Sequence, residues 1–373
     1  MKIIIVSAAF PYRGGIAHFT QMLYNELIKN HEVSVVTFSR QYPKLFFPGK
    51  TQYEPTLLKD APDSEELLDS INPFNWNSVG KTVKNKNADL VIFNFWMPFF
   101  GPCFGTAARR IKKNKRTKIL IIAHNVISHD AKIGDRMLTK YFFNAADYFI
   151  TMSKSVQKDL QKFKPNAKQK LLFHPIYSNF GTSIKKNDAV EFLKLSDKPT
   201  LLFFGFIRKY KGVDILLKTV ELLKEKLDLQ LIIAGEFYDN KQKYLDLIDL
   251  LNIGKQVRIF SDFIPNSEVK YYFSVCDVVV LPYREATQSG IFQIANNFEK
   301  PIIVTDVGGL GEEIEQGKTG FVVEKNNPQI LADAIFKYFK ENKIEEFSLN
   351  VKRKKEKYSW TNFVKGIEQL VSK

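Results

Sequence analysis

The chain has few of the residues that build disulfide frameworks or metal centres. Among its 373 residues there are 2 cysteines and 5 histidines. Cys103 and Cys276 lie far apart in the sequence, and neither has a Cys or His neighbour at metal-ligand spacing. The sequence therefore indicates neither a disulfide framework nor a zinc site, and a reducing cytoplasm suits it.

Long apolar runs are also missing. No stretch approaches the roughly twenty apolar residues that a membrane-spanning helix needs. Residues 2–8 superficially resemble a signal peptide, but the run is short and is followed at once by Pro11-Tyr12-Arg13-Gly14-Gly15. That order is typical of a first core strand and its loop. We expect a soluble protein of the cytoplasm, or one that lies peripherally on the inner face of the membrane.

Acidic side chains are too few to balance the basic ones. The chain has 55 Lys and Arg residues against 40 Asp and Glu, a net charge of +15, and basic clusters occur at 109–118 and 352–357. A solvated surface is the simplest interpretation, and an anionic membrane surface is the second. Nucleic acid is the weakest, because no helix-turn-helix, finger, RRM or KH signature accompanies the charge.

Apolar residues make up 45% of the chain, and the length exceeds what one core usually serves. Short Val-, Ile- and Phe-rich runs alternate with helical patterns, which predicts parallel sheets covered by helices on both faces. The first series of strand-like runs is 2–8, 32–38, 88–95, 118–124, 148–153 and 170–174. The second series is 200–205, 229–235, 257–260, 278–282, 302–306 and 320–323.

The alternation stops over 178–199 and then restarts. We therefore predict two doubly wound, Rossmann-like α/β domains over 1–178 and 179–358, with a final helix, 359–373, packing back on the first domain. Residues 41–74, rich in proline and charge, are expected to form a surface excursion. Ligands of doubly wound sheets bind beyond the carboxyl ends of the strands, so we expect the substrate in a cleft between the domains.

Three loops in the second half suit a nucleotide diphosphate. The loop 205–212 carries Arg208 and Lys211 between a strand and a helix, 282–290 again opens a helix, and 300–309 is a strand that ends in a glycine pair. A helix N-terminus exposes unpaired N–H groups and the positive end of the helix dipole. Arg208 and Lys211 add full charges. Each loop alone is common in α/β proteins, but their succession in one domain predicts a pyrophosphate site.

These residues resemble the retaining glycosyltransferases of the GT-B fold, family 4, also called glycosyl transferases group 1. The resemblance covers nearly the whole chain. In the first half it rests on Pro11 to Gly15, on Ala123-His124-Asn125-Val126 and on the aromatic segment Phe95 to Pro102. In the second half it rests on the Arg208 and Lys211 loop, on Ala234-Gly235-Glu236 and on Tyr283 to Gly290.

The resemblance implies a retaining, metal-independent hexosyltransferase without a cofactor. Its substrate would be a nucleotide sugar, UDP- or GDP-linked, and its acceptor a saccharide or lipid-linked molecule in cell-surface polysaccharide or glycolipid biosynthesis. Cations and dipoles would stabilise the charge that develops on the departing diphosphate. The implied catalytic residues are His124, Arg208, Lys211 and Glu285. The implied donor-binding residues are Gly14, Gly15, Glu236, Thr287, Gln288, Ser289, Gly290 and Gln293.

The chain departs from the family pattern at two places. Members usually carry two glutamates eight positions apart. Counting from Glu285 gives Gln293, and aligning on Lys300-Pro301 gives Ala286 and Ile294, so the pair is absent in either register. Gln288 or Gln293 is then the candidate for the ribose. The arginine that often follows the first glycine of the phosphate loop is replaced by Phe206, with Arg208 as its substitute. His124 fits a role at the donor sugar and a strand-end histidine bonded to a carbonyl equally well.

Two other functions are alternatives to the transferase. A nicotinamide-dependent oxidoreductase should show Gly-x-Gly-x-x-Gly after its first strand, and residues 11–15 do not supply it. A non-catalytic homologue would bind a nucleotide sugar and act as partner or activator of another transferase. The missing glutamate pair keeps that second alternative open, and measured turnover of a nucleotide sugar separates it from the enzyme.

Overall fold

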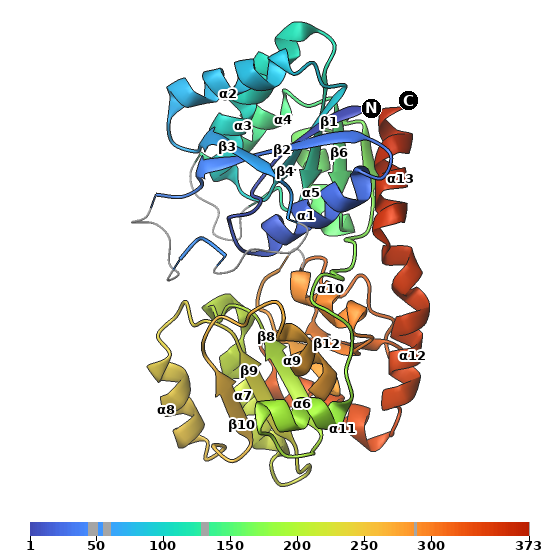
Figure 1. Ribbon diagram of the computed structural model, residues 1–373. Coiled ribbons are helices and arrows are strands. Elements are labelled where there is room, and N and C mark those ends of the chain that lie inside the picture. The colour runs from blue at the N-terminus through green and yellow to red at the C-terminus, as the bar shows by residue number, and fades with distance from the viewer. Residues whose placement is uncertain (44–50, 55–60, 128–133, 287–288, 373) are drawn as a thin grey trace. The chain divides into compact units, whose positions relative to one another are not determined.

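The computed structural model describes residues 1–43, 51–54, 61–127, 134–286 and 289–372, and each of its two compact units is built on one parallel sheet (Figure 1). Unit 1 comprises Met1–Pro175 and Tyr358–Lys373, and unit 2 comprises Ile176–Lys357. Helices cover both sheets, so the predicted α/β class with two doubly wound sheets is confirmed.

Unit 1 contains a seven-stranded sheet in the order β3-β2-β1-β4-β5-β6-β7. The central strands are Val- and Ile-rich and buried on both faces, as expected of a parallel sheet between helices. The strands are β1 (Lys2–Val6), β2 (Glu32–Arg40), β3 (Ser64–Asp69), β4 (Leu90–Phe95), β5 (Lys118–Ala123), β6 (Tyr148–Thr151) and β7 (Gln169–Leu171). The helices are α1 (Gly15–Leu27), α2 (Pro73–Asn85), η2 (Pro98–Phe100), α3 (Gly101–Ile111), η3 (Lys112–Asn114), α4 (Asp135–Phe143), α5 (Lys154–Phe163) and α13 (Trp360–Val371).

Unit 2 contains a six-stranded sheet in the order β10-β9-β8-β11-β12-β13. The strands are β8 (Thr200–Phe204), β9 (Gln230–Ala234), β10 (Val257–Phe260), β11 (Val278–Leu281), β12 (Ile302–Thr305) and β13 (Gly320–Val323). The helices are α6 (Lys186–Leu193), η4 (Lys209–Lys211), α7 (Val213–Leu223), α8 (Gln242–Leu250), α9 (Val269–Val275), α10 (Gly290–Asn297), α11 (Pro328–Lys340), α12 (Ile344–Lys354) and η5 (Lys355–Tyr358).

The expectation that residues 41–74 form only a surface excursion is wrong, because they include β3. This strand pairs in parallel with β2 at the edge of the sheet, with register shifts beside Phe38. Its sequence, Ser-Glu-Glu-Leu-Leu-Asp, buries only Leu68. An exposed acidic edge strand lacks the alternation by which strands are recognised, so the pattern could not reveal it. The break predicted over 178–199 similarly contains a helix, α6.

The final helix, α13, belongs to unit 1 and packs against α1 (Figure 1). The ring of Trp360 contacts Phe19 in an edge-to-face arrangement, with 5.0 Å between centroids. Thr361 Oγ1 donates to Glu26 Oε1 at 2.7 Å, and His31 Nε2 lies 2.8 Å from Glu368 Oε1. Apolar ring contacts and polar side-chain contacts thus hold α13 against α1.

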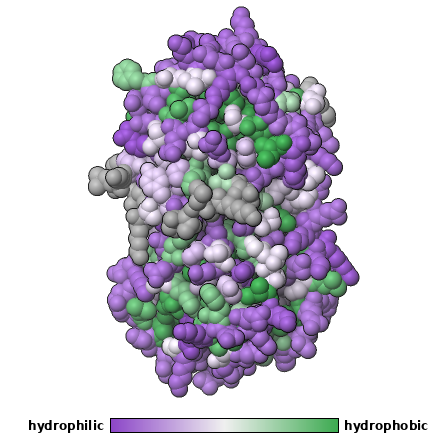
Figure 2. All heavy atoms as spheres, viewed as in Figure 1, coloured by the Kyte–Doolittle hydropathy of each residue, from purple (hydrophilic) through white to green (hydrophobic). Residues whose placement is uncertain are grey.

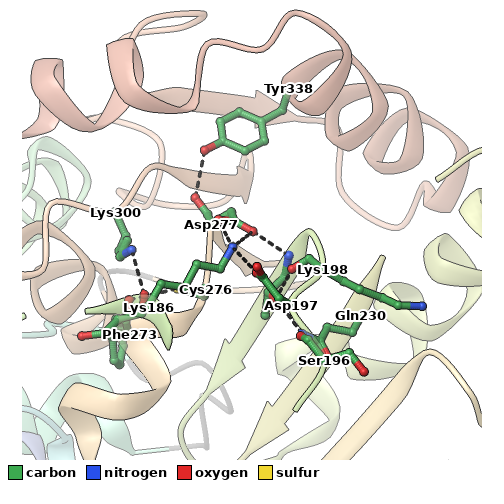
Figure 3. Close-up of polar contacts among 12 residues, drawn as sticks. Lys186, Ser196, Asp197, Lys198, Gln230, Phe273, Cys276, Asp277, Lys300 and Tyr338 are labelled. Carbon is green, nitrogen blue, oxygen red and sulfur yellow. Dashed lines mark hydrogen bonds and ion pairs between the residues drawn. The ribbon is translucent and has the colours of Figure 1, made fainter. Parts of the chain in front are cut away.

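The amino edges of both sheets are closed by aspartates that precede a strand. Asp89 accepts the backbone N–H of Lys2 at 2.8 Å, and Asp147 accepts that of Ile119 at 2.8 Å. In unit 2, Asp277 accepts from the Thr200 backbone N–H at 2.8 Å and from Lys186 Nζ at 2.9 Å (Figure 3). Each carboxylate satisfies a donor that the neighbouring strand would leave unpaired. The opposite, carboxyl edges remain for the functional loops.

Candidate active site

The strand order of unit 2 reverses between β8 and β11, which lie side by side in the sheet. Loops that leave neighbouring strands in opposite directions open a crevice at such a switch point, and ligands bind there. The loops after β8 and β11, 205–212 and 282–290, are two of the three loops for which the sequence predicts a pyrophosphate, and we call these two the phosphate loops. The fold therefore brings both of them to one place.

Lys211 is the most unusual cation of this edge. Its side chain is only 9% exposed, and a Cβ at Gly205 would lie 3.3 Å from its Nζ, so the ammonium sits over the end of β8. The ring of Tyr283, from the other loop, lies 5.6 Å from Nζ. Within the described residues Lys211 Nζ makes neither a hydrogen bond nor an ion pair. Burial, together with the nearby positive charge of Arg208, lowers the pKa of Lys211 to about 7.

Arg208, in contrast, is exposed at the start of η4. Its guanidinium lies 4.8 Å from the centre of the Tyr238 ring, which follows β9. The ring of Phe206, the residue that replaces the family arginine, packs on Tyr238 at 4.6 Å between centroids. Arg208 is thus supported by an aromatic pair and carries its charge at the surface, beside the buried charge of Lys211.

Gly212 fixes the approach of the two loops. It precedes α7 with φ +70°, and a Cβ at this position would lie 2.0 Å from the Pro282 carbonyl oxygen. Only a residue without a side chain permits both the backbone conformation and the contact. The N-terminus of α7 therefore lies directly against the loop that follows β11.

An ion pair that the sequence did not reveal ties the same loops together. Arg284 donates from Nη1 to Asp214 Oδ1 at 2.9 Å and from Nη2 to Oδ2 at 2.6 Å, and Nη1 also donates to the Lys209 carbonyl at 2.7 Å. Burial opposes ionisation of Asp214, but the hydrogen bonds and charge of Arg284 outweigh it and lower the pKa of the carboxyl. The sequence shows Asp214 as an acidic residue in the first turn of a helix. It does not reveal the pair, because the partner, Arg284, lies 70 positions further along the chain.

Replacement of Arg284 by alanine should loosen the donor site and destabilise unit 2. A bidentate pair to a half-buried carboxylate is lost and Asp214 is left without its partner, which we expect to cost about 2 kcal/mol. Thermal unfolding with and without a nucleoside diphosphate measures both effects. Lys198→Ala, which removes an exposed pair with Asp228, is the matched control and should change the melting temperature little.

The second loop presents its predicted residues in different ways. Glu285 is exposed, whereas Thr287 and Gln288 lie outside the described residues. Ser289 precedes α10 without capping it, and its Oγ lies 3.4 Å from the Tyr283 hydroxyl. Gly290 opens the helix beside the ring of Tyr177. The first turn of α10 thus has no cap from Ser289 and can present its N–H groups to an anion.

Gln293 lies further along α10 and is 2% exposed. Its amide oxygen accepts from Asn296 at 3.2 Å, and its amide nitrogen lies 3.4 Å from Glu313 Oε2. Glu236 is buried after β9, and its carbonyl accepts from the Ile207 N–H at 2.8 Å, which joins the ends of β8 and β9. In the third loop, Asp306 is exposed after β12 and Gly308 has φ +52°.

Unit 1 repeats the arrangement at its own switch point, between β1 and β4. Gly14 precedes α1 with φ +108°, no side chain caps this helix, and Gly15 is exposed at its first position. A helix N-terminus without a side-chain cap, the kind of position at which anions bind, therefore follows the first strand, where the glycine pair was predicted to lie.

His124 directly follows β5, and its backbone N–H donates to the Phe95 carbonyl at 2.8 Å. Its ring packs edge-on against Phe19 at 4.6 Å and lies 6.3 Å from the ring of His174. The Nε2 atom is buried, and no partner for it is present among the described residues. Burial and the nearby His174 lower the pKa of His124, so the ring is neutral at physiological pH. A neutral imidazole can accept or relay a proton but carries no charge for phosphate.

Over the described ranges, no three or more His, Cys, Asp or Glu side chains lie together in a way that could hold a metal ion. Cys103 and Cys276 are both buried, and burial raises the pKa of each thiol.

Comparison with known families matches both halves of the chain. The model of the glycosyl transferases group 1 covers residues 185–371. That of glycosyltransferase family 4 covers residues 13–175. The phosphate loops lie inside the first match, and Gly14, Gly15 and His124 lie inside the second.

Similar proteins extend over the full length. An uncharacterized glycosyltransferase of Methanocaldococcus jannaschii is 25% identical over 379 residues, covering 99% of this chain and 97% of the relative. Among solved structures, Anabaena HepE in complex with UDP-glucose superposes with a TM-score of 0.79 at 16% identity, covering 100% of both chains. Sucrose-phosphate synthase from Thermosynechococcus elongatus gives a TM-score of 0.76, also at 16% identity, and covers 100% of this chain and 98% of the synthase.

These structures share the two-sheet architecture, which is the GT-B fold. With its phosphate loops gathered at the switch point of unit 2, the chain belongs to the glycosyl transferases group 1 family and is a glycosyltransferase.

Proposed function

We propose that the protein transfers a hexose from a nucleoside diphosphate sugar, UDP- or GDP-linked, to a saccharide or lipid-linked acceptor, with retention of configuration. The single observation that carries this proposal is the buried ammonium of Lys211, which has no anionic partner in the described part of the chain. A buried charge without a counterion is costly, and a bound diphosphate supplies that counterion. The adjacent N-terminus of α7 adds its dipole.

In the proposed reaction the bond between the anomeric carbon and the phosphate oxygen breaks. Negative charge then grows on the departing nucleoside diphosphate, where Lys211 and Arg208 stabilise it. We assign the N–H groups at Ser289 and Gly290 to the same phosphates. The acceptor oxygen forms the new bond to the anomeric carbon, and its proton passes to a phosphate oxygen of the departing nucleoside diphosphate, which acts as the base. Neither a metal ion nor a cofactor is part of this scheme.

Further residues are assigned to the sugar and the nucleotide by family resemblance. We propose that His124 and Glu285 contact the donor sugar, and that Gly14 and Gly15 offer N–H groups to the donor. Of the two glutamines considered for the ribose, Gln293 is committed to Asn296 and Glu313, so Gln288 is the better candidate. We propose that Glu236 also contacts the donor, and the hydrogen bond between its carbonyl and the Ile207 N–H of the first phosphate loop supports this assignment.

The HepE structures provide support for the donor class, because they hold UDP, UDP with glucose, and UDP-glucose. A further structural neighbour is named a lipopolysaccharide outer core galactosyltransferase. We therefore place the reaction in the assembly of cell-surface polysaccharide or glycolipid, on the cytoplasmic side of the membrane.

Product analysis tests the proposal. The protein is incubated with UDP- and GDP-linked hexoses and simple saccharide acceptors, and the anomeric configuration of the product is read by proton NMR. We expect release of the nucleoside diphosphate and the donor's anomeric configuration in the product. An inverted product would contradict retention. Nucleotide binding with no turnover of any donor would favour the non-catalytic alternative.

Donor binding should take up a proton near pH 8. The free Lys211 pKa of about 7 leaves the amine largely neutral there, and the diphosphate favours its charged form, so uptake should approach about one proton per nucleotide sugar. Between about pH 7 and 10.5 the Lys211 amine is largely neutral in the free folded protein and charged in the unfolded chain. Donor binding, which restores the charged form, therefore takes up a proton. Calorimetry in buffers of different ionisation enthalpy measures the proton number. In Lys211→Arg, whose guanidinium stays charged, the uptake should vanish.

A further inference from the structure

The two basic clusters of the sequence have different surroundings. In the cluster 352–357, Lys354 pairs with Glu315 at 2.7 Å, while Lys352 and Lys355 lie 3.6 and 3.7 Å from Glu299 carboxylate oxygens. Carboxylates of unit 2 therefore balance much of its charge. The cluster 109–118 has two such pairs, Lys112 with Asp147 and Arg116 with Asp89. Its remaining basic residues make no ion pair in the described chain.

Of these remaining charges, Arg109 and Arg110 lie in α3, which packs between α2 and α4 in a layer of three helices in unit 1. Lys113 and Lys115 follow α3 directly, in η3 and at its end. A Cβ at Gly80 of α2 would lie 2.6 Å from the Cβ of Arg110, and one at Gly105 of α3 would lie 2.6 Å from the Tyr141 ring of α4. The helices therefore approach closely at both seams. Their outer sides form one continuous surface, in contrast to three separated ridges.

This surface, which we call the basic face, carries cations from all three helices and almost no acid. Asp135 is the only acidic residue in α2, α3 and α4. The guanidinium of Arg109 in α3 lies 3.8 Å from the centre of the Tyr141 ring in α4, so one of the charges of α3 lies over α4. The cations without an ion pair in the described chain are Lys81, Lys84, Arg109, Arg110, Lys113, Lys115, Arg136 and Lys140.

Large apolar side chains stand out from the same helices. Phe74 is 89% exposed at the start of α2, and it lies two turns before Lys81 on the same side of that helix. Met137 and Tyr141, one turn apart on α4, are 70% and 39% exposed. Figure 2 shows that hydrophilic residues predominate on the visible face of unit 1, with a group of apolar residues among them. None of the helices in the described ranges has the length and hydrophobicity to cross a bilayer.

We propose that the basic face docks unit 1 onto an anionic phospholipid bilayer. The unpaired lysines and arginines lie within reach of the negative surface potential, and Phe74 and Met137 enter the interfacial region, where an exposed apolar side chain gains most. Charge complementarity alone would also suit a nucleic acid. The exposed side chains of Phe74 and Met137 favour the bilayer, because they have no counterpart in phosphate-backbone recognition.

Sedimentation with lipid vesicles tests this proposal on the full chain. The protein should bind vesicles of mixed phosphatidylcholine and phosphatidylglycerol and stay in solution with phosphatidylcholine alone. Lys81, Lys113 and Lys140 are exposed and have no side-chain partner in the described chain, so their replacement by glutamate should leave the fold intact. We expect that triple variant to lower vesicle partitioning by at least about a hundredfold. Phe74→Ala should lower it by about fivefold, with less sensitivity to salt.

A charge-matched control uses unit 2. Lys243, Lys255 and Lys325 are likewise exposed and unpaired in the described chain, and their replacement by glutamate changes the net charge equally. Partitioning that falls as far in this control would show that net charge alone decides binding and would overturn the basic face. Equal binding to neutral vesicles, or binding to an RNA oligonucleotide but not to anionic vesicles, would overturn it as well. Donor hydrolysis in solution should be unchanged in all these variants, so the test is independent of the transferase proposal.

Discussion

Lys211→Ala is expected to lower the kcat/KM of sugar transfer by about two to three orders of magnitude. The ammonium lies over the end of β8 between the two phosphate loops, where charge on the leaving diphosphate would develop. Its loss removes an electrostatic contact that a water molecule at the same buried position replaces poorly. Steady-state transfer rates with the active nucleotide sugar measure the effect.

The matched control is Lys209→Ala, two positions earlier in the same short helix. Lys209 is exposed, and its side chain has no partner in the described chain, so the variant should retain nearly full activity. Lys211→Met should lose activity without losing thermal stability. Below about pH 7 the native protein holds a buried charge that the variant lacks, so the variant should melt no lower than wild type. Similar rates in Lys211→Ala and wild type would remove this lysine from the reaction.

Gly212→Ala is expected to destabilise unit 2 by about 3 kcal/mol or more and to abolish donor binding. Two costs add. The residue has φ +70°, which an alanine adopts at about 1 to 2 kcal/mol, and the new Cβ would lie 2.0 Å from the Pro282 carbonyl oxygen. To relieve that contact, the loop after β11 must move away from the N-terminus of α7. Both phosphate loops lose their geometry together.

Gly317→Ala separates the two costs. Gly317 has φ +71°, and nothing lies within 4 Å of the Cβ that alanine would add. The conformational cost is therefore the same, while the clash is absent. Denaturant unfolding of both variants should show a difference of at least about 2 kcal/mol in the unfolding free energy. Equal destabilisation would mean that the two loops do not touch at Gly212.

The sequence predicts the strands of both sheets because parallel strands are apolar on both faces and read as short Val- and Ile-rich runs. The final helix is predicted within 359–373, and in the structure it spans Trp360–Val371. β3 and α6 are missed for one physical reason. Their sequences are mostly exposed and carry many charges, so hydrophobic periodicity, on which the prediction depends, is absent from them.

The site is predictable only as far as local chemistry reaches. One loop holds Arg208, Lys211 and Gly212, and these residue types together predict a phosphate-binding site. The burial of Lys211 is a tertiary property, since it depends on Gly205 and on Tyr283 from another loop. The pair between Arg284 and Asp214 joins positions that are distant in sequence. Gln293 fits a ribose contact by spacing, yet the fold directs its amide to Asn296 and Glu313.

Calorimetric titration of the protein with nucleoside diphosphates tests the account most directly. UDP or GDP should bind the wild type, and its affinity should fall by about a hundredfold in Lys211→Met, since a buried charge-assisted contact to phosphate is lost. The affinity for the corresponding nucleoside, which has no phosphate, should be the same in both proteins. Diphosphate affinity that is unchanged by Lys211→Met would contradict the assignment of this carboxyl edge to the donor pyrophosphate.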